Sequence, residues 1–494
     1  MASPLISGAP GETHLLLGNE AIVRGAVEAG IQFISCYPGT PSSEVPDTFF
    51  RLASEGGYTF EYSVNEKVAL EVGGGATLAG ALTLVTMKHV GVNVAADPLF
   101  TLAYTGTPGG FVLLSADDPG CHSSQNEQDN RIYARIAGLP CLEPATAQEA
   151  KDMTKAALGL SRQLGTPVLL RTTTRVNHLR GPVELGVAEK LPAPVGFQKN
   201  PSRFVPIPAF ARPMHLRLMD ILEQARELAN SSPLNTISGS GQVGVVASGI
   251  SRAYLADALL EADLTGKVKV LELGFTHPLP EALLETFMDG LTTLLVLEEL
   301  EPVMETELRA LAQKRGLTLS ILGKTPGPMP RFGEFSVEMV AQALRGVLGL
   351  PAKAACACAP QALPNRPPNL CAGCPHRATY VAVRKVYGDS AVYSSDIGCY
   401  TLGILPPLKA ADFLLCMGSS ISAGCGAAKA TGQDVVAFIG DSTFFHSGIT
   451  GLVNALFNRH NLLVCILDNR TTAMTGHQPN PGVDKTTMGD NPVR

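Results

Sequence analysis

Two polar residues near the end of the chain follow predicted buried strands and could hold a divalent cation. Asp441 comes directly after the apolar run 435–440 (VVAFIG), and Asn469, 28 residues later, directly follows the run 462–468 (LLVCILD). Residues 443–461 provide one helix-length crossover, so the two runs are predicted to be neighbouring parallel strands. The carboxyl ends of such strands meet at the sheet edge where ligands bind, so both residues are expected there.

Oxygen atoms at this edge would suit Mg²⁺. The carboxylate of Asp441, the side-chain amide of Asn469 and the main-chain carbonyl of Thr471 are hard ligands, and Mg²⁺ takes its remaining ligands from a diphosphate. Gly440 and Ser442 complete a GDS sequence around the aspartate. A GD pair alone is better explained as a turn after a strand. The second strand, the asparagine and the spacing together favour a cofactor site.

Cysteines form a second group with chemical potential. Cys371 and Cys374 make a CxxC sequence, and Cys399 follows 25 residues after the second of them. Thiolates suit zinc and iron–sulfur clusters, and free buried thiols are the alternative. Cys356 and Cys358 lie in an Ala/Pro-rich segment, and no role is assigned to them.

Composition bounds the class of protein. The chain has 494 residues, 45% hydrophobic and 17% charged, which allows several domains with buried cores and excludes general disorder. A net charge of −6 does not favour nucleic acid, and no apolar run is long enough to cross a bilayer. The N-terminal sequence lacks a signal-peptide pattern, and 11 cysteines, an odd number, fit a reducing compartment. We therefore expect a cytoplasmic protein.

Alternating strands and helices are predicted to position these residues in three α/β units, each with a covered parallel sheet. The strands expected in the first unit are Gln32–Cys36, Leu82–Thr86, Phe111–Ser115 and Pro167–Arg171, and its helices include Asn19–Ala29 and Asn65–Ala79. The strands expected in the second unit are Val243–Ser248, Val268–Leu273 and Thr293–Glu298. The third unit contains the two runs that precede Asp441 and Asn469.

Changes in composition predict the domain boundaries. Residues 1–185 form the first domain, 186–235 a Pro-rich linker or wrapping segment, and 236–348 the second domain. Residues 349–366 are a linker too rich in Ala and Pro for a core element, and 367–494 form the last domain. Because the chain ends 25 residues after the asparagine at position 469, the last sheet is expected to be incomplete.

Long motifs give the chain a resemblance to a known family. The segment 440–482, from GDSTFFHSG to GHQPNPG, resembles the corresponding stretch of the large (alpha) subunits of indolepyruvate:ferredoxin oxidoreductases. LCAGCPHRATY (370–380) and DIGCYTLG (396–403) resemble the same proteins, as do CYPGTPSSEV (36–45) and DDPGCHSSQNEQDNRIYAR (117–135) near the N-terminus. The resemblance runs through the whole chain.

The family implies a fold and a function. Two thiamine-diphosphate-binding folds, a pyrimidine-binding one over 1–185 and a diphosphate-binding one over 367–494, would flank a transketolase C-terminal-like domain, all three doubly wound α/β units. The implied reaction is oxidative decarboxylation of an arylpyruvate with CoA to aryl-acetyl-CoA and CO₂. Electrons would pass through iron–sulfur clusters to ferredoxin. The implied cofactors are thiamine diphosphate and Mg²⁺, and a smaller second subunit is the expected partner.

The family also implies a catalytic glutamate beside N1′ of the aminopyrimidine, where its hydrogen bond promotes removal of the C2 proton. By resemblance this is Glu66, which opens a helix whose Gly73–Gly75 would leave room for close approach. Glu71 is the alternative, because its neighbours are also small. The non-catalytic interpretation of Glu66 is a solvated helix face beside Lys67.

Substrate-binding residues follow from the same resemblance. YPGTPSS (37–43) resembles the substrate-side loop of 2-oxoacid oxidoreductases, in which Thr40 would donate a hydrogen bond to the oxoacid; otherwise the sequence is a rigid turn. Arg131 is the candidate for the substrate carboxylate, because a guanidinium binds a carboxylate bidentately. Simple exposure is the alternative for an arginine in so polar a stretch. His122 is a weaker candidate near the same loop.

In related oxidoreductases a CxxC sequence, a third cysteine and a more distant fourth hold a 4Fe–4S cluster near thiamine. The resemblance gives this role to Cys371, Cys374 and Cys399. The fourth ligand is not evident: Cys416 and Cys425 are available, or it lies beyond residue 494.

Two other functions stay open at this point. A non-oxidative thiamine-dependent decarboxylase or synthase would work without ferredoxin and without an iron–sulfur cluster. A scaffold subunit would use the cofactor fold for assembly and would not bind thiamine diphosphate. The sequence does not fix the side chain of the oxoacid.

Overall fold

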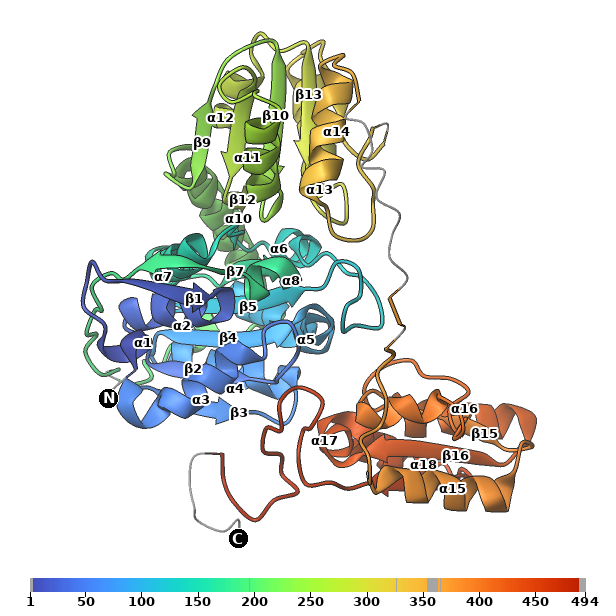
Figure 1. The fold of residues 1–494 in the computed structure, drawn as a ribbon. Helices are drawn as coiled ribbons and strands as arrows, with labels where there is room; N and C mark the ends of the chain where they lie inside the picture. The colour runs from blue at the N-terminus through green and yellow to red at the C-terminus, as the bar shows by residue number, and fades with distance from the viewer. Residues whose placement is uncertain (1–2, 195, 326, 353–362, 365, 488–494) are drawn as a thin grey trace. The chain divides into compact units, whose positions relative to one another are not determined.

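The computed structural model describes residues 3–194, 196–325, 327–352, 363–364 and 366–487. The chain forms two compact units, Met1–Ala355 and Cys356–Arg494, which are described separately (Figure 1).

A seven-stranded sheet is the centre of the first part of unit 1, with strand order β12-β6-β7-β5-β4-β2-β3. All neighbours are parallel except β12, which is antiparallel to β6. The strands are β2 (Phe33–Cys36), β3 (Thr59–Tyr62), β4 (Thr83–Lys88), β5 (Phe111–Asp117), β6 (Cys141–Leu142), β7 (Val168–Thr173) and β12 (Phe275–His277). The four strands expected in this unit are confirmed, each within two residues at its ends.

Helices cover both faces of this sheet, as expected for a doubly wound fold. Alternate residues of β5 point to opposite sides: Val112 and Leu114 pack with one group of helices, Phe111 and Leu113 with the other. The first group is α2 (Gly18–Glu28), α3 (Glu44–Gly56) and α7 (Ala147–Leu164). The second is α4 (Glu66–Leu78), α5 (His89–Thr105) and α6 (Arg131–Ala137).

Shorter elements complete the first part of unit 1. β1 (Thr13–Leu17) pairs antiparallel with β8 (Arg180–Glu184) as a separate two-stranded sheet. The short helices are α1 (Pro4–Ser7), α8 (Thr174–His178) and α9 (Pro201–Phe204).

A second sheet in unit 1 has five strands in the order β14-β13-β10-β11-β9. They are β9 (Asn235–Ser238), β10 (Val243–Ser248), β11 (Lys269–Leu273), β13 (Thr293–Leu297) and β14 (Ser320–Leu322). Helices α11 (Ser251–Glu261) and α14 (Val337–Val347) cover one face, and α12 (Glu281–Met288) and α13 (Val303–Lys314) cover the other. The three expected strands are confirmed.

The segment 186–235, expected to be a Pro-rich linker or a wrapping segment, contains a long helix. It is α10 (Pro208–Asn230), a helix of 23 residues. Leu218 of this helix packs in the core on one face of the first sheet, and Ile221 and Ala225 pack in the core on the opposite face. The prolines of this segment suggested a break, but Pro208 occupies the first turn of the helix, where proline is well tolerated, and Pro213 lies within the helix.

Unit 2 is built on a three-stranded parallel sheet in the order β15-β16-β17. Its strands are β15 (Val392–Ser394), β16 (Val435–Gly440) and β17 (Leu463–Leu467). Its helices are α15 (His376–Tyr387), η1 (Cys399–Ile404), α16 (Ser419–Thr431), α17 (Asp441–Thr443), the π-helical η2 (Phe444–Gly448) and α18 (Ile449–Phe457). The crossover expected over 443–461 is therefore helical, and the strands it joins are parallel neighbours, as predicted.

The expected linker at 349–366 is described in part. Residues 353–362 and 365, which include Cys356 and Cys358, lie outside the described residues. Its described residues are in no helix or strand. Among the residues that the structure describes, no helix is both long enough and apolar enough to cross a membrane.

Candidate functional site

Asp441 and Asn469 follow neighbouring strands of unit 2 at the same sheet edge. Gly440, the last residue of β16, is in register with Leu467, the last residue of β17. Asp441 therefore comes one position after the end of its strand, and Asn469 two positions after the end of the other. Asp441 is buried, whereas Asn469 is exposed. This placement agrees with the one expected from the two apolar runs.

One oxygen of the Asp441 carboxylate is engaged and the other is open. Asn480 donates from Nδ2 to Asp441 Oδ2 over 2.9 Å. Within the described residues, no hydrogen bond reaches Asp441 Oδ1. A buried carboxylate with so few donors is costly unless a cation completes its shell. Asp441 thus fits a ligand of a hard cation such as Mg²⁺.

Asn480 was not found by sequence reasoning. It is 8% exposed and lies 39 residues after the aspartate whose oxygen it contacts. The sequence around it, PNPG, indicates a turn and nothing more, because the return of that turn to Asp441 depends on the whole loop.

The loop after β17 is held by hydrogen bonds that place its main chain. Thr472 N and Thr471 Oγ1 both donate to the carbonyl of Gln478, over 2.9 and 3.2 Å. Thr472 Oγ1 also lies 2.8 Å from Ser442 Oγ, next to the aspartate. Asn469 Oδ1 accepts from Thr471 N over 3.2 Å. The structure therefore brings the segment with Asn469 and Thr471 to the GDS turn, as the sequence predicts.

The side chains of Tyr400 and His376 also lie near Asp441. A Cβ at Gly440 would lie 2.4 Å from Cε1 of Tyr400, so only glycine fits there. His376 is buried, and burial lowers the pKa of its imidazole while the nearby Asp441 opposes that shift. His376 was also missed, although it directly follows the CxxC sequence and its proline.

The amino end of α16 is capped from within unit 2. Asp396 is buried, its Oδ1 accepts from Gly418 N over 2.8 Å, and its Oδ2 accepts from Ser420 N over 3.0 Å. These N–H groups of the first turn are thus satisfied by a side chain of the protein.

In unit 1, Glu66 opens α4 with its side chain buried. Asn65 caps the helix by accepting from Val68 N over 2.8 Å. Glu66 is only 4% exposed, and a Cβ at Gly91 would lie 2.6 Å from its Cγ. Gly91 therefore makes the room for this carboxylate. Of the run Gly73–Gly75, Gly73 packs closely on the sheet, since a Cβ there would lie 2.5 Å from Cγ2 of Val85, whereas a Cβ at Gly75 would meet nothing within 4 Å.

Burial separates the two glutamate candidates. Glu71 is exposed and forms an ion pair with Lys67 one turn earlier on the same helix, in solvent. A solvated pair of this kind is an ordinary surface feature. The buried position of Glu66 thus favours it over Glu71 for proton chemistry.

Thr40 lies in the loop that follows β2, and this loop contacts the segment that follows β5. Its Oγ1 is 3.3 Å from Ser43 Oγ, and its carbonyl accepts from Ser123 Oγ over 3.4 Å. Lys88, the last residue of β4, packs its side chain against Gly39 of the same loop. Thr40 and Lys88 therefore come to one edge of the first sheet.

Arg131 is not placed as expected. Its guanidinium is buried: Nε donates to Asp129 over 2.9 Å, Nη1 to Glu298 over 2.7 Å, and Nη2 to the carbonyls of Glu299 and Glu301. A substrate carboxylate would have to displace a carboxylate already bonded there. We therefore do not carry forward the role of Arg131 in binding substrate. His122 is exposed and lies 3.2 Å from Glu334.

The three cysteines proposed to hold a cluster are neighbours in unit 2. Cys371 is exposed, while Cys374 and Cys399 are half-buried. Burial first, and then the thiols of Cys371 and Cys374, raise the pKa of the Cys399 thiol. No three or more His, Cys, Asp or Glu side chains in the described part of the chain converge in a geometry that could hold a metal ion.

Of the two cysteines considered as a fourth ligand, Cys425 packs in the core between α16 and the sheet, and Cys416 is exposed. The cluster therefore stays a prediction.

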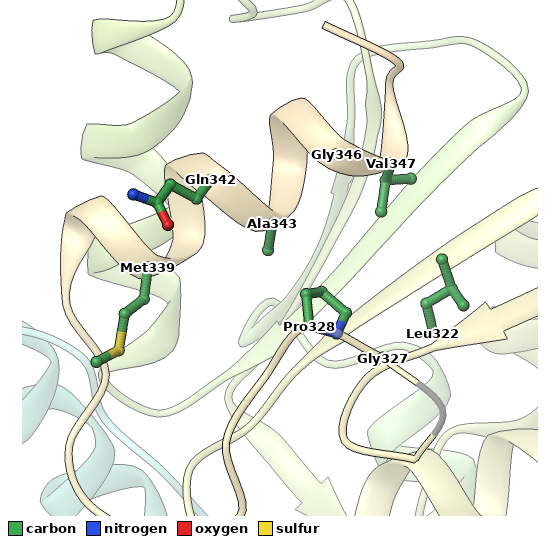
Figure 2. A pocket seen from close by; sticks show the side chains of 8 residues that line it. All are labelled: Leu322, Gly327, Pro328, Met339, Gln342, Ala343, Gly346 and Val347. Atoms are coloured by element: carbon green, nitrogen blue, oxygen red, sulfur yellow. The ribbon is translucent and has the colours of Figure 1, made fainter. Parts of the chain in front are cut away.

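A cavity of about 450 Å³ lies elsewhere in unit 1, beside α14 (Figure 2). Figure 2 shows Ala343 and Val347 of this helix on one side, and Leu322 of β14 and Pro328 on the other. Gln342 is its one polar side chain. None of the residues predicted to act in catalysis or binding lines it.

Comparison with known proteins gives matches over both units. Residues 24–220 match the family described as "Pyruvate flavodoxin/ferredoxin oxidoreductase, thiamine diP-bdg". Residues 396–493 match the family described as "Thiamine pyrophosphate enzyme, C-terminal TPP binding domain". The first range contains Glu66, and the second contains Asp441 and Asn469.

Two similar proteins are archaeal. The chain is 49% identical over 495 residues to indolepyruvate oxidoreductase subunit IorA of Methanothermobacter thermautotrophicus, covering 98% of this chain and 80% of that protein. It is 46% identical over 511 residues to the protein of the same name from Pyrococcus abyssi, covering 97% and 78%.

Among solved structures, a 2-oxoglutarate:ferredoxin oxidoreductase from Magnetococcus marinus is similar with a TM-score of 0.54 and 16% identity, over 68% of this chain and 65% of that one. At that identity the likeness concerns the fold alone.

Proposed function

Because the chain belongs to the family of indolepyruvate oxidoreductase subunit IorA, we propose that it is the thiamine-diphosphate-binding subunit of a 2-oxoacid:ferredoxin oxidoreductase that acts on arylpyruvates. Both thiamine-binding family matches support the cofactor. The observation that carries the proposal is the buried Asp441 at the end of β16, with one carboxylate oxygen open beside the loop of Asn469.

The residues around Asp441 would hold the diphosphate end of the cofactor through Mg²⁺. Asp441 Oδ1, the side-chain oxygen of Asn469 and the carbonyl of Thr471 are the ligands that we assign. Gly440 and Ser442 flank them, and Asn480 orients the carboxylate by binding its other oxygen. This set has the oxygen chemistry that Mg²⁺ requires.

Glu66 would share a proton with N1′ of the aminopyrimidine. Its burial and its close packing against Gly91 support this role, because a carboxyl group held away from water can meet the flat aminopyrimidine ring. When bound, thiamine diphosphate supplies a nucleophilic carbon and an electron sink for decarboxylation. Thr40 would donate a hydrogen bond to the oxoacid from the facing loop.

The overall reaction balances with CoA and a one-electron carrier. One arylpyruvate anion and one CoA thiol give one aryl-acetyl-CoA, one CO₂, one proton and two electrons. Ferredoxin would receive the electrons one at a time, through iron–sulfur clusters of which Cys371, Cys374 and Cys399 would hold one. The partner subunit implied by the name IorA of its relatives completes the enzyme.

The test is turnover by the complete oxidoreductase, purified without oxygen. Indolepyruvate, phenylpyruvate and pyruvate are supplied in turn with CoA and methyl viologen, and acyl-CoA, CO₂ and reduced viologen are measured. We expect aryl substrates to give the highest kcat/KM, with two viologens reduced for each acyl-CoA. Release of CO₂ and free aldehyde without an acceptor would show a non-oxidative decarboxylase instead. Absence of both turnover and thiamine diphosphate binding would show a scaffold subunit.

A further inference from the structure

The carboxylate of a 2-oxoacid needs a cationic partner, and the expected one is occupied. Arg131 is bonded to Asp129 and Glu298 in the interior of unit 1. The other cations near the carboxyl ends of β5 and β7 are also paired with carboxylates: Arg171 with Asp117 and Glu143, Arg175 with Glu334, and His178 with Glu44. His89 is buried, and burial lowers the pKa of its imidazole to about 4, so it is neutral.

Lys88 differs from these side chains. It ends β4 between β2 and β5, at the sheet edge that also carries Thr40. A Cβ at Gly39 would lie 2.9 Å from Cγ of Lys88, so the lysine stem lies against the PGTP loop. Nζ donates to the carbonyl of Ser123 over 2.9 Å. The ammonium group is thus fixed between the loop of Thr40 and the loop after β5.

The charge of Lys88 has no carboxylate in contact. Within the described residues, Nζ makes one hydrogen bond and no ion pair, although an ammonium has three donors. Burial lowers the pKa of Lys88, while Asp118 and Glu66, farther away, oppose the shift. Asp118 is itself satisfied by neutral donors: Ser123 N at 2.8 Å, Ser124 Oγ at 2.6 Å and Thr174 Oγ1 at 2.7 Å. Two donors of a half-buried cation therefore stay open to a bound anion.

We propose that Lys88 binds the carboxylate of the 2-oxoacid, in the role that the sequence suggested for Arg131. The inference rests on the proposed function, since it concerns how that site selects an acid. Its position supports the assignment: Glu66 is close enough to act on Lys88 electrostatically, and Gly39 places Thr40 beside it. One substrate would thus meet a hydrogen-bond donor for its keto oxygen and a cation for its carboxylate.

The experiment compares an arylpyruvate with its methyl ester, which lacks the charge. Competitive inhibition of the complete oxidoreductase by phenylpyruvate and by methyl phenylpyruvate is measured for wild type, Lys88→Met, Lys88→Arg and the control Lys67→Met. Lys67 is exposed and one residue from Glu66. Affinity for thiamine diphosphate is measured in parallel as a check on folding.

We expect Lys88→Met to weaken binding of the acid about 10- to 100-fold, the usual worth of a charged hydrogen bond, and to leave the ester unchanged. Lys88→Arg restores part of the preference for the acid, and Lys67→Met matches wild type. If Lys88→Met binds thiamine diphosphate and keeps the wild-type preference for acid over ester, the inference is wrong while the proposed function stands. If wild type itself shows no thiamine diphosphate binding and no oxoacid turnover, it is the proposed function that fails.

Discussion

At the scale of single residues, burial and pairing separate candidates that the sequence leaves equal. Glu66 and Glu71 lie on one helix, but the first is buried against Gly91 and the second is in a solvated ion pair. Arg131 and Lys88 are both cations of unit 1, but the arginine is saturated with acceptors and the lysine is not. Residue type alone therefore could not assign these roles.

Glu66→Gln tests the assignment of the proton-sharing carboxyl group. Gln keeps the size of the side chain but cannot share a proton in the same way, so we expect thiamine diphosphate to bind while turnover falls by roughly 10²- to 10⁴-fold. Exchange of the C2 proton of the bound cofactor with deuterium, followed by NMR, measures the step directly. Glu71→Gln is the matched control and should retain wild-type exchange. A fully active Glu66→Gln with an inactive Glu71→Gln would move the assignment to Glu71.

The sequence predicted that Asp441 and Asn469 lie at one sheet edge, because both follow strands that are recognisable as apolar runs. It did not locate Asn480 or His376, which act on Asp441 from other elements. Their positions depend on long-range packing that no local pattern encodes. Lys88 was hidden for the same reason, since a lysine at the end of a strand is usually solvated.

At the scale of elements, the longer strands were predictable and the shortest ones were not. β4, β5 and β10 are six or seven residues long, and each was predicted within two residues at its ends. β6 and β12 have two and three residues, too few to show a period, and they pair only because the chain after β11 returns to the first sheet. The helix α10 was missed because its prolines suggested a linker.

Asn235→Ala tests whether α10 and β12 are integral to unit 1. Asn235 Nδ2 donates to Ala229 O over 2.9 Å at the end of the helix, and its Oδ1 accepts from Phe275 N over 2.9 Å at the start of the strand. Since Asn235 is buried, removing its amide leaves these groups unpaired, at a cost of about 1–3 kcal/mol. Urea denaturation measures the loss. Asn93→Ala, at an exposed position where the side chain accepts one hydrogen bond from Tyr133, should cost less than Asn235→Ala.

At the scale of the whole molecule, unit 1 contains a buried network of charges between its two sheets. Arg131 of the first part bonds to Glu298, which follows β13 of the second sheet. Glu299, next to it, is 3% exposed; it accepts from Phe335 N over 2.9 Å, and its Oε2 has no hydrogen-bond partner within the described residues. Burial raises the pKa of Glu299 to about 7.

This raised pKa gives a pH dependence with a definite sign. Glu299 binds its proton more tightly in the folded than in the unfolded chain, so its contribution to stability is full below pH about 4.5 and is lost as pH rises through about 7. The glutamine of Glu299→Gln stays neutral at all these pH values, so the variant lacks the pH-dependent contribution of Glu299 to stability. We expect the variant to gain stability relative to wild type between pH 5 and 7, by up to about 1.4 kcal/mol per pH unit, with no further gain above that range.

Denaturant midpoints of both proteins at several pH values measure the effect, and the slope with pH is the informative quantity. Glu301→Gln is the control, because that side chain is paired with Arg331 at the surface. A constant difference between wild type and Glu299→Gln across this range would show that Glu299 is ionised when folded.

Binding of thiamine diphosphate by the purified complex, titrated calorimetrically with and without Mg²⁺, tests the central claim most directly. We expect wild type to bind thiamine diphosphate only with Mg²⁺. Asp441→Ala and Asn469→Ala should each bind it at least about tenfold more weakly, because each variant loses an oxygen ligand of the cation. Asp434→Ala, at an exposed position before the first residue of β16, should bind as wild type does. Wild-type affinity in both Asp441→Ala and Asn469→Ala would contradict the account.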